Sequence, residues 1–316
     1  MPIKLQQTII FFMHWTTSMV RYLFCAIIAL LSGCQAVPRA ASWPVEPEVS
    51  VRWVNDYPMA FTDRGTGPTV VFVHGVLNDH SVWILQSRYL AHHGWNVLAV
   101  DLPGHCRSAG EAPASVEAAA DFIAALLDAA GVAQAALVGH SWGSLIALET
   151  ASRLKARISH LVLVGTAFPM KVTPALLEAS LNAPLQAMKM INVFSRATLA
   201  APPSALGPGT WVYGASMALN KRVLASNTKV NVFHRGFSAC DQYANGLQAM
   251  AAVTCPVLFL LGAQDQMTTP KAAQSLVQQA RESGKTFKVV NVPMGHHQMN
   301  ESPEETLKAI QEFLQA

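Results

Sequence analysis

A serine between two glycines is the residue of this sequence best placed for covalent chemistry. Residues 139–143 read Gly-His-Ser-Trp-Gly, the G-x-S-x-G pattern of a nucleophile elbow. The apolar run at 135–138 predicts a buried strand before it, and the spacing of residues 144–149 predicts a helix after it. In so tight a turn, glycines avoid collisions that side chains would cause. We therefore predict that Ser141 is a nucleophile for acyl transfer.

A serine hydroxyl needs a base, and the base needs a carboxylate to orient it. The apolar run at 256–261 predicts a buried strand, and Asp265 follows it. A further predicted strand at 287–292 is followed by His296 and His297. These residues come after Ser141 in the order serine, acid, histidine, so the sequence contains the parts of a catalytic triad. From the residues alone, either histidine could be the base.

The composition indicates a globular chain with a sizeable core. Of 316 residues, 51% are hydrophobic and 13% are charged, and the formal net charge is +3. This charge is too small to indicate nucleic-acid binding, and no array of basic and aromatic residues appears. Cys106, Cys240 and Cys255 include no C-x-x-C pair and are interpreted as buried thiols, although a disulfide between two of them stays open. We expect no metal site and no cofactor.

Strands and helices alternate along most of the chain. The run at 69–73 predicts a buried strand, and residues 113–130 predict a helix with one apolar face. This alternation predicts a mostly parallel sheet with helices on both faces, and such sheets bind ligands at the carboxyl ends of their strands. Ser141, Asp265 and the two histidines all follow predicted strands, so we expect them at one edge of the sheet.

Four motifs in order resemble the α/β-hydrolase family over about residues 51–316. They are the elbow, His-Gly-Val-Leu at 74–77, Asp-Leu-Pro-Gly-His-Cys-Arg-Ser at 101–108, and a G-H-x-x-x-x-E-x-P tail from Gly295 to Pro303. The resemblance implies an α/β-hydrolase fold with a mostly parallel central sheet, helices on both faces, and a helical cap inserted at about 166–250. Cys106 stands where this family usually has glycine, which is expected to restrict the backbone there.

The resemblance also implies roles for individual residues. The N–H groups of Val76 and Trp142 are expected to form the oxyanion hole. Asp265 is the expected acid, because the other position that the family uses, after a predicted strand at 161–165, has no carboxylate. The spacing of the tail selects His296 as the base over His297. In this interpretation, Ser141, Asp265 and His296 form the catalytic triad.

Two further pairs of residues are assigned structural roles. Asp101 and Arg107 are expected to brace their turn as a charge pair. Ser302 and Glu305 have the spacing of a capping box for a C-terminal helix that starts at Pro303.

The predicted cap gives some information about the substrate. It contains seven basic and two acidic residues, a net charge of +5, which argues against an aminopeptidase because that activity needs acids to hold an ammonium group. Some of its apolar side chains could line an acyl pocket, although ordinary packing explains most of them. The residues considered are Leu185, Met188, Ile191, Phe194, Trp211, Tyr213, Met217 and Leu219.

These features predict a serine hydrolase, and first a carboxylesterase acting on small-molecule esters or lipids with short to medium acyl chains. A serine at the elbow, where dehalogenases and epoxide hydrolases need aspartate, disfavours those chemistries. Two alternatives stay open: a carbon-carbon bond hydrolase of the ring-cleavage type, and a ligand-binding receptor with a slow triad. The sequence does not predict an oligomeric state.

The N-terminal segment resembles a bacterial lipoprotein signal. An apolar run at 22–31 follows Arg21 and ends in Leu-Ser-Gly-Cys, in which Cys34 would be lipidated. Residues 1–33 would then be a signal peptide and residues 34–50 a proline-containing tether, followed by the hydrolase domain. This interpretation predicts a lipid-anchored protein of the bacterial cell envelope, with Cys34 as its membrane contact. An uncleaved membrane anchor and a cleaved secretory signal remain the alternatives.

Overall fold

The computed structural model describes residues 49–54, 57–64, 67–197 and 211–316. The signal segment, Cys34 and nearly all of the predicted tether lie outside the described residues. The chain divides into two compact units, Met1–Glu46 and Pro47–Ala316, and all described elements belong to the second. In these described ranges, no helix is long and apolar enough to span a membrane.

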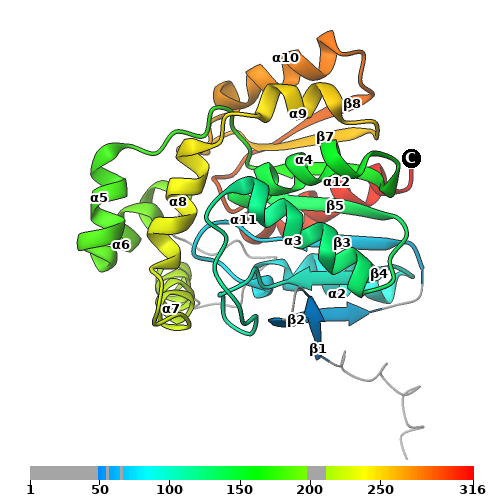
Figure 1. The fold of residues 1–316 in the computed structure, drawn as a ribbon. Coiled ribbons are helices and arrows are strands. Elements are labelled where there is room, and N and C mark those ends of the chain that lie inside the picture. The colour runs from blue at the N-terminus through cyan, green and yellow to red at the C-terminus, as the bar shows by residue number, and fades with distance from the viewer. Residues whose placement is uncertain (1–48, 55–56, 65–66, 198–210) are drawn as a thin grey trace, which may run out of the picture. The chain divides into compact units, whose positions relative to one another are not determined.

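One eight-stranded sheet forms the centre of this unit, in the order β1-β2-β4-β3-β5-β6-β7-β8 (Figure 1). The six strands from β4 to β8 in this order are parallel, while β2 runs antiparallel to both β1 and β4. The mostly parallel sheet expected from the alternating pattern is confirmed. The strands are β1 (Val49–Val54), β2 (Tyr57–Arg64), β3 (Thr69–Val73), β4 (Asn96–Val100), β5 (Ala135–His140), β6 (Ile158–Val164), β7 (Val257–Gly262) and β8 (Phe287–Val292).

Helices cover both faces of the sheet (Figure 1). Because side chains alternate along a strand, Val71 and Val73 of β3 pack under one helix layer, while Val70 and Phe72 pack under the other. The first layer contains α3 (Val116–Ala129), α4 (Trp142–Leu154), α9 (Gly246–Ala252) and α10 (Gln274–Glu282). The second contains α2 (Ile84–His92), α11 (Gln298–Glu301) and α12 (Pro303–Leu314). Short 3-10 helices are η1 (His80–Trp83), η2 (Lys155–Arg157) and η3 (Pro270–Ala273).

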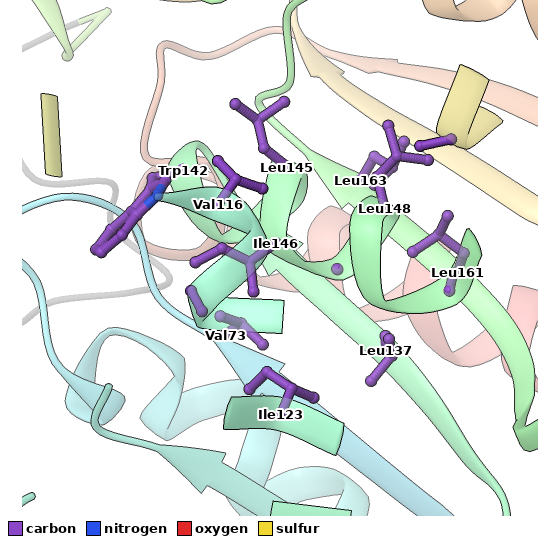
Figure 2. Close-up of a cluster of buried hydrophobic side chains, with 14 of the residues drawn as sticks. Val73, Val116, Ile123, Leu137, Trp142, Leu145, Ile146, Leu148, Leu161 and Leu163 are labelled. Carbon is purple, nitrogen blue, oxygen red and sulfur yellow. The ribbon is translucent and has the colours of Figure 1, made fainter. Parts of the chain in front are cut away.

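Helix α4 is the most deeply buried helix around the site. Every residue of α4 from its start to Ser152 is buried, and the serine, threonine and glutamate side chains in this stretch are hydrogen-bonded, as buried polar groups require. Figure 2 shows Leu145 and Ile146 of α4 in one cluster with Ile123 of α3 and Leu137 of β5. The residue that precedes α4 is therefore held on a tightly packed base.

Between β6 and β7 the described residues form five helices, in the segment expected to be a cap. Four of them, α5 to α8, lie together beside the sheet (Figure 1) and share a separate apolar cluster that includes Met188, Phe233 and Phe237. Their bounds are α5 (Pro174–Asn182), α6 (Pro184–Phe194), α7 (Val212–Ala225) and α8 (Val232–Gln242). The fifth helix, α9, packs against α4 and α10 instead.

The expected capping box at the start of α12 is wrong in detail. Pro303 is the first helical residue, as expected, but the Ser302 side chain accepts no backbone N–H. The Ser302 hydroxyl instead donates to the Glu305 carboxylate at 2.6 Å. Ser302 has φ −137° and ψ 62°, a backbone conformation outside the extended region from which an N-cap side chain usually reaches the first helical N–H groups.

Candidate active site

Ser141 occupies the turn between β5 and α4. The strand ends at His140 and the helix begins at Trp142, which leaves Ser141 at φ 53° and ψ −121°. A positive φ is costly for a residue with a side chain, so packing must hold this conformation. The Ser141 N–H donates to the Val164 carbonyl at 2.9 Å, and this bond ties the turn to the end of β6.

The two glycines of the motif are needed because backbone atoms approach them closely. A Cβ added to Gly139 would lie 2.1 Å from the Gly143 carbonyl oxygen, and one added to Gly143 would lie 2.4 Å from the Val73 carbonyl oxygen. Neither neighbour is a flexible side-chain end that could move away. These contacts agree with the collision argument made from the sequence, and they fix the elbow against β3.

Asp265 and His296 meet at the carboxyl ends of β7 and β8. Nδ1 of His296 lies 2.8 Å from Oδ2 of Asp265, and both side chains are buried. The other carboxylate oxygen accepts the N–H groups of Met267 and Thr268, both at 2.8 Å. Burial alone would raise the pKa of Asp265, but the facing His296 and these hydrogen bonds hold it below its ordinary value. Asp265 is therefore a charged carboxylate that can accept a hydrogen bond from the imidazole N–H.

Thr268 is a member of this cluster that sequence reasoning missed. Its hydroxyl oxygen lies 3.0 Å from Nδ1 of His296, 2.8 Å from Oδ2 of Asp265 and 2.9 Å from the Gly165 carbonyl oxygen. A hydroxyl has one hydrogen to donate and two lone pairs, so it can receive the imidazole N–H while donating to one of the oxygens. The signal in the sequence was a hydroxyl residue three positions after Asp265, inside the turn that this carboxylate closes.

The two neighbouring histidines differ in their contacts. Among the described residues, Asp265 is hydrogen-bonded to the ring of His296. The ring of His297 instead packs at a tilt against the ring of His140, with 5.3 Å between the two ring centres. Burial, and then the nearby charge of Arg196, hold the pKa of His297 well below its ordinary range. The geometry thus brings His296 to the acid and leaves His297 as a neutral ring beside it.

His140 lies under the turn as a neutral side chain. Its Nε2 is 2.8 Å from the His296 carbonyl oxygen, and because a carbonyl only accepts, Nε2 carries the hydrogen. Burial and the neighbouring His296 hold the pKa of His140 well below its ordinary range. These contacts give His140 a packing role under the turn.

Val76 and Trp142, the expected oxyanion donors, both lie beside Ser141. Trp142 is the first residue of α4, and the first N–H groups of a helix have no partner within it. Val76 lines the same cavities as Ser141. A Cβ on Gly75 would lie 3.1 Å from Cβ of Ser141, so the absence of a side chain lets this loop approach the serine. Both N–H groups therefore come from elements that adjoin Ser141, as an oxyanion hole requires.

The turn after β4 is braced differently from the expectation. The charge pair predicted between Asp101 and Arg107 is wrong in its partner, because the ring of His80 lies 2.8 Å from the Asp101 carboxylate. Arg107 contributes its backbone N–H to the same carboxylate at 3.2 Å. This pairing could not be predicted from the sequence, because a helix and a strand separate His80 from Asp101.

The three cysteines in the described part of the chain are free thiols. Cys240 and Cys255 are buried, but Cys106 is half-buried, so the expectation of three buried thiols is wrong for one of them. Cys106 has φ 43°, in the left-handed region that explains why glycine suits this position. Its thiol lies 3.4 Å from an oxygen of Asp79, and burial together with that carboxylate raises the pKa of the thiol to about 12.

Asp79, His80 and Asp101 form the one group in the described parts of the chain with the spacing of a metal site. Their carboxylates already accept hydrogen bonds from neighbouring groups, including His80 for Asp101, and Ser81 and Arg222 for Asp79. These donors are arranged to satisfy the carboxylates directly. We therefore interpret the group as a structural network between the core and α7.

Two cavities meet at Ser141 and His296. The larger has a volume of about 240 Å³, and its walls are mainly apolar side chains of the loop after β6 and of α5, α6 and α8. Of the eight apolar cap residues considered from the sequence, Ile191 and Phe194 line it. The wall also includes Met170, Leu176, Met190, Phe237 and Met267. The smaller cavity, of about 40 Å³, has mainly polar neighbours.

Comparisons with known proteins agree with this architecture. A sequence profile described as alpha/beta hydrolase fold matches residues 68–303. An epoxide hydrolase of Caballeronia sordidicola is 36% identical over 101 residues, which are 31% of this chain and 30% of the relative. The chain spans only about a third of the length of the curated relatives it matches.

Solved structures resemble the chain over more of its length. The esterase EaEST from Exiguobacterium antarcticum has a TM-score of 0.71 at 18% identity, covering 84% of this chain and 99% of its own. A membrane phospholipase A has a TM-score of 0.66 at 23% identity, covering 96% of this chain and 98% of its own. At such identities the likeness establishes the fold.

Proposed function

The chain belongs to the alpha/beta hydrolase fold family and is a hydrolase, and from that premise we propose that it is a carboxylesterase for esters or lipids with short to medium acyl chains. One observation carries the proposal. The cavity of about 240 Å³ has Ser141 and His296 in its wall and is otherwise lined mainly by apolar side chains. An apolar cavity beside a serine and a histidine suits an acyl chain whose carbonyl carbon must reach the serine.

In the proposed mechanism, Ser141 Oγ attacks the ester carbonyl carbon and gives its proton to Nε2 of His296. Asp265 holds Nδ1–H of the same ring at 2.8 Å, which leaves Nε2 to take the serine proton and stabilises the imidazolium that forms. The N–H groups of Val76 and Trp142 bind the carbonyl oxygen as it becomes negative. The alcohol leaves with the proton from His296. Water then repeats these steps on the acyl-enzyme and releases the acid.

The similarity to an epoxide hydrolase does not imply epoxide opening by this chain, because residue 141 is a serine. Opening an epoxide through a covalent intermediate needs a carboxylate nucleophile, and the side chain at the elbow here is a hydroxyl. A serine attacks a carbonyl and forms an acyl-enzyme, which is the reaction that the two expected oxyanion donors would assist.

The test is hydrolysis of a graded series of chromogenic acyl esters by the full chain. We expect turnover to rise with acyl length until the cavity is filled and to fall beyond it. Ile191→Trp narrows the cavity and should move the optimum to shorter chains, while Lys189→Ala, at an exposed position of the same helix, should leave it in place. Absence of turnover for every ester would refute the proposal and favour a carbon-carbon bond hydrolase or a receptor.

We also propose that residues 1–33 are a signal peptide and that a lipid on Cys34 anchors the protein in the bacterial cell envelope. The support is the Leu-Ser-Gly-Cys sequence at 31–34 after a short apolar run. Metabolic labelling with an alkyne fatty acid should mark the wild-type protein and Cys255→Ser, but not Cys34→Ser. Equal labelling of the Cys34 variant would contradict the anchor.

A further inference from the structure

The outward side of helix α6 is apolar although it is exposed to solvent. Lys189 is the one charged residue in this helix, and Leu185, Val193 and Phe194 are each about half exposed. In α12, by contrast, every exposed residue is charged. A surface helix normally turns charged or polar side chains outward, and a helix that is apolar all round is normally enclosed. The described residues leave this side of α6 uncovered, so its composition indicates a partner outside them.

Exposed apolar side chains are concentrated on the cap. Of the eight large ones in the described parts of the chain, five lie in the cap, so they are not scattered evenly over the surface. They are Leu181, Leu185, Val193, Phe194 and Trp211. Figure 1 shows α5 and α6 at the outer edge of the cap, with α8 between them and the sheet. Exposed apolar side chains that are grouped in this way mark an interaction surface.

We call Leu185, Lys189, Val193 and Phe194 the α6 face. The first three are spaced four residues apart, which is the spacing of neighbours along one side of a helix. Phe194 belongs both to this face and to the wall of the acyl cavity, whereas Val193 lines neither cavity at the nucleophile. The exposed side chain of Gln266 also lines the acyl cavity, so the cavity reaches the surface. An apolar chain that lies on the α6 face is therefore next to the acyl cavity.

The charge around the α6 face is positive. The cap contains seven basic and two acidic residues, and all nine lie in the described ranges. Lys189 is exposed within the face and forms no ion pair with a described residue. Of the two acids, Asp241 already lies 3.8 Å from Lys171. An anionic lipid surface complements this face, because the long lysine stem lets the ammonium reach headgroup phosphates while its neighbours enter the apolar layer.

The same lysine opposes a second copy of this chain as the partner. In a two-fold symmetric contact a patch faces itself, so the two copies of Lys189 would come together within an apolar surface. Like charges placed together at an interface oppose binding. A lipid bilayer has an apolar layer beneath its headgroups and avoids this repulsion. It also brings acyl chains to the acyl cavity, which a protein partner does not.

We propose that the α6 face docks on an anionic lipid bilayer and that the acyl chain of the substrate passes from the bilayer past Phe194 into the acyl cavity. Leu185 and Val193 enter the apolar layer, and Lys189 binds headgroup phosphates. The docking rests on the surface itself, whereas the assignment of membrane lipids as substrates rests on the proposed esterase function. The substrate class is then an acyl lipid held in a membrane rather than a dissolved ester.

Footprinting of exposed lysines tests the docking without reference to activity. The full chain is acetylated with a water-soluble succinimidyl ester, with and without vesicles of phosphatidylcholine and phosphatidylglycerol, and the labelled peptides are quantified by mass spectrometry. We expect these vesicles to slow acetylation of Lys189 about fivefold, the effect of binding one lysine to an anionic surface. Lys308, an exposed lysine of α12, is the control, and its acetylation rate should stay unchanged.

Substitutions on the α6 face test the delivery of the substrate. Leu185→Ser combined with Val193→Ser should lower kcat/KM for dioctanoylglycerol in these vesicles about tenfold, because two half-exposed apolar side chains no longer enter the bilayer. Neither residue lines the cavities at Ser141, so kcat/KM for dissolved 4-nitrophenyl butyrate should stay within about twofold of wild type, which also shows that the variant folds. Leu85→Ser removes a leucine of α2 that is 41% exposed, against 47% for Leu185, and should change neither value.

The outcomes separate docking from catalysis. Equal acetylation of Lys189 with and without vesicles would overturn the docking. If rising protein concentration slows this acetylation and vesicles do not, the α6 face is a contact between copies of the chain, which also overturns the proposal. An unchanged kcat/KM for dioctanoylglycerol in the double variant would overturn delivery of the substrate through this face. If vesicles protect Lys189 but no ester is hydrolysed, the docking stands and the esterase function fails.

Discussion

The Thr268 hydroxyl lies 3.0 Å from Nδ1 of His296, the ring nitrogen that Asp265 also holds at 2.8 Å. Threonine and aspartate therefore share one imidazole N–H, and the hydroxyl also lies 2.8 Å from the carboxylate. Such a hydroxyl fixes the orientation of both partners before any substrate binds.

We predict that Thr268→Val, which keeps the shape and removes the hydroxyl, lowers kcat about tenfold with little change in KM, because positioning of the base matters most in the transition state. Thr268→Ser keeps the hydroxyl and serves as the control, with kcat within about twofold of wild type. Steady-state kinetics on one chromogenic ester measure both. Equal kcat for Thr268→Val and wild type would show that the carboxylate alone orients His296.

A second prediction concerns Gly143. A Cβ there meets the carbonyl oxygens of Val73 and His74 at 2.4 and 2.6 Å, so Gly143→Ala must displace the elbow. A displacement of about 1 Å can lower activity about 10²-fold. Gly284→Ala is the control, because its φ of +63° strains an alanine while no atom lies within 4 Å of the new Cβ. It should cost about 1 kcal/mol of stability and leave kcat/KM unchanged; similar activity losses in both variants would contradict the packing argument.

A third prediction concerns acid stability. Burial, and then the nearby His74, lower the pKa of His105 from 6.5 to about 4. The neutral ring therefore contributes stability above pH 6.5, and this contribution is lost as the pH falls from 6.5 to about 4, by about 3 kcal/mol in total.

His105→Asn keeps a donor for the Pro103 carbonyl, which the ring now contacts at 3.0 Å, but cannot titrate. Urea unfolding at several pH values should show a slope between pH 4 and 6.5 that is shallower by up to about 1.4 kcal/mol per pH unit. An unchanged slope would mean that His105 is already protonated in the folded protein.

A fourth prediction concerns the buried carboxylate of Glu149. The Tyr243 hydroxyl donates to it at 2.7 Å, and Arg153 binds its other oxygen, so this network links the segment between α8 and α9 to α4. Tyr243→Phe should lower the free energy of unfolding by about 1.5–3 kcal/mol, the range for a hydrogen bond to a charged group. Lys308→Ala, which removes an exposed pair with Glu312 at 3.9 Å, should change it by less than about 0.5 kcal/mol. An equal loss of unfolding free energy in both variants would contradict the prediction that the buried Tyr243 hydrogen bond stabilises the fold more than the exposed ion pair does.

Much of the fold could be predicted because its signals are local. The strands predicted at 69–73 and 287–292 are observed with those same bounds, and the helix predicted at 113–130 is observed at Val116–Ala129 with Ser115 as its N-cap. The strand predicted at 135–138 extends to His140, because a polar residue can continue a strand when the neighbouring strand pairs with it. Apolar periodicity cannot signal such an extension.

The candidate site was predictable where a short motif carried it. Ser141, Asp265 and His296 each follow a strand within a few residues, so strand order alone brought them to one edge of the sheet. Contacts between distant segments were not predictable. The contact of His80 with Asp101 and the position of Ser195 beside the smaller cavity depend on how separate loops pack, and no spacing in the sequence encodes that.

The central claim is that Ser141 is the nucleophile, and a covalent label tests it most directly. A fluorophosphonate reacts with a serine only when a neighbouring base activates it, so the full chain should gain one phosphonyl group on the peptide that contains Ser141, in parallel with loss of esterase activity. His296→Ala should slow the labelling, and Ser141→Ala should abolish it and lower kcat about 10⁴-fold to 10⁶-fold. Label on another serine, or ester turnover that persists in Ser141→Ala, would contradict the account.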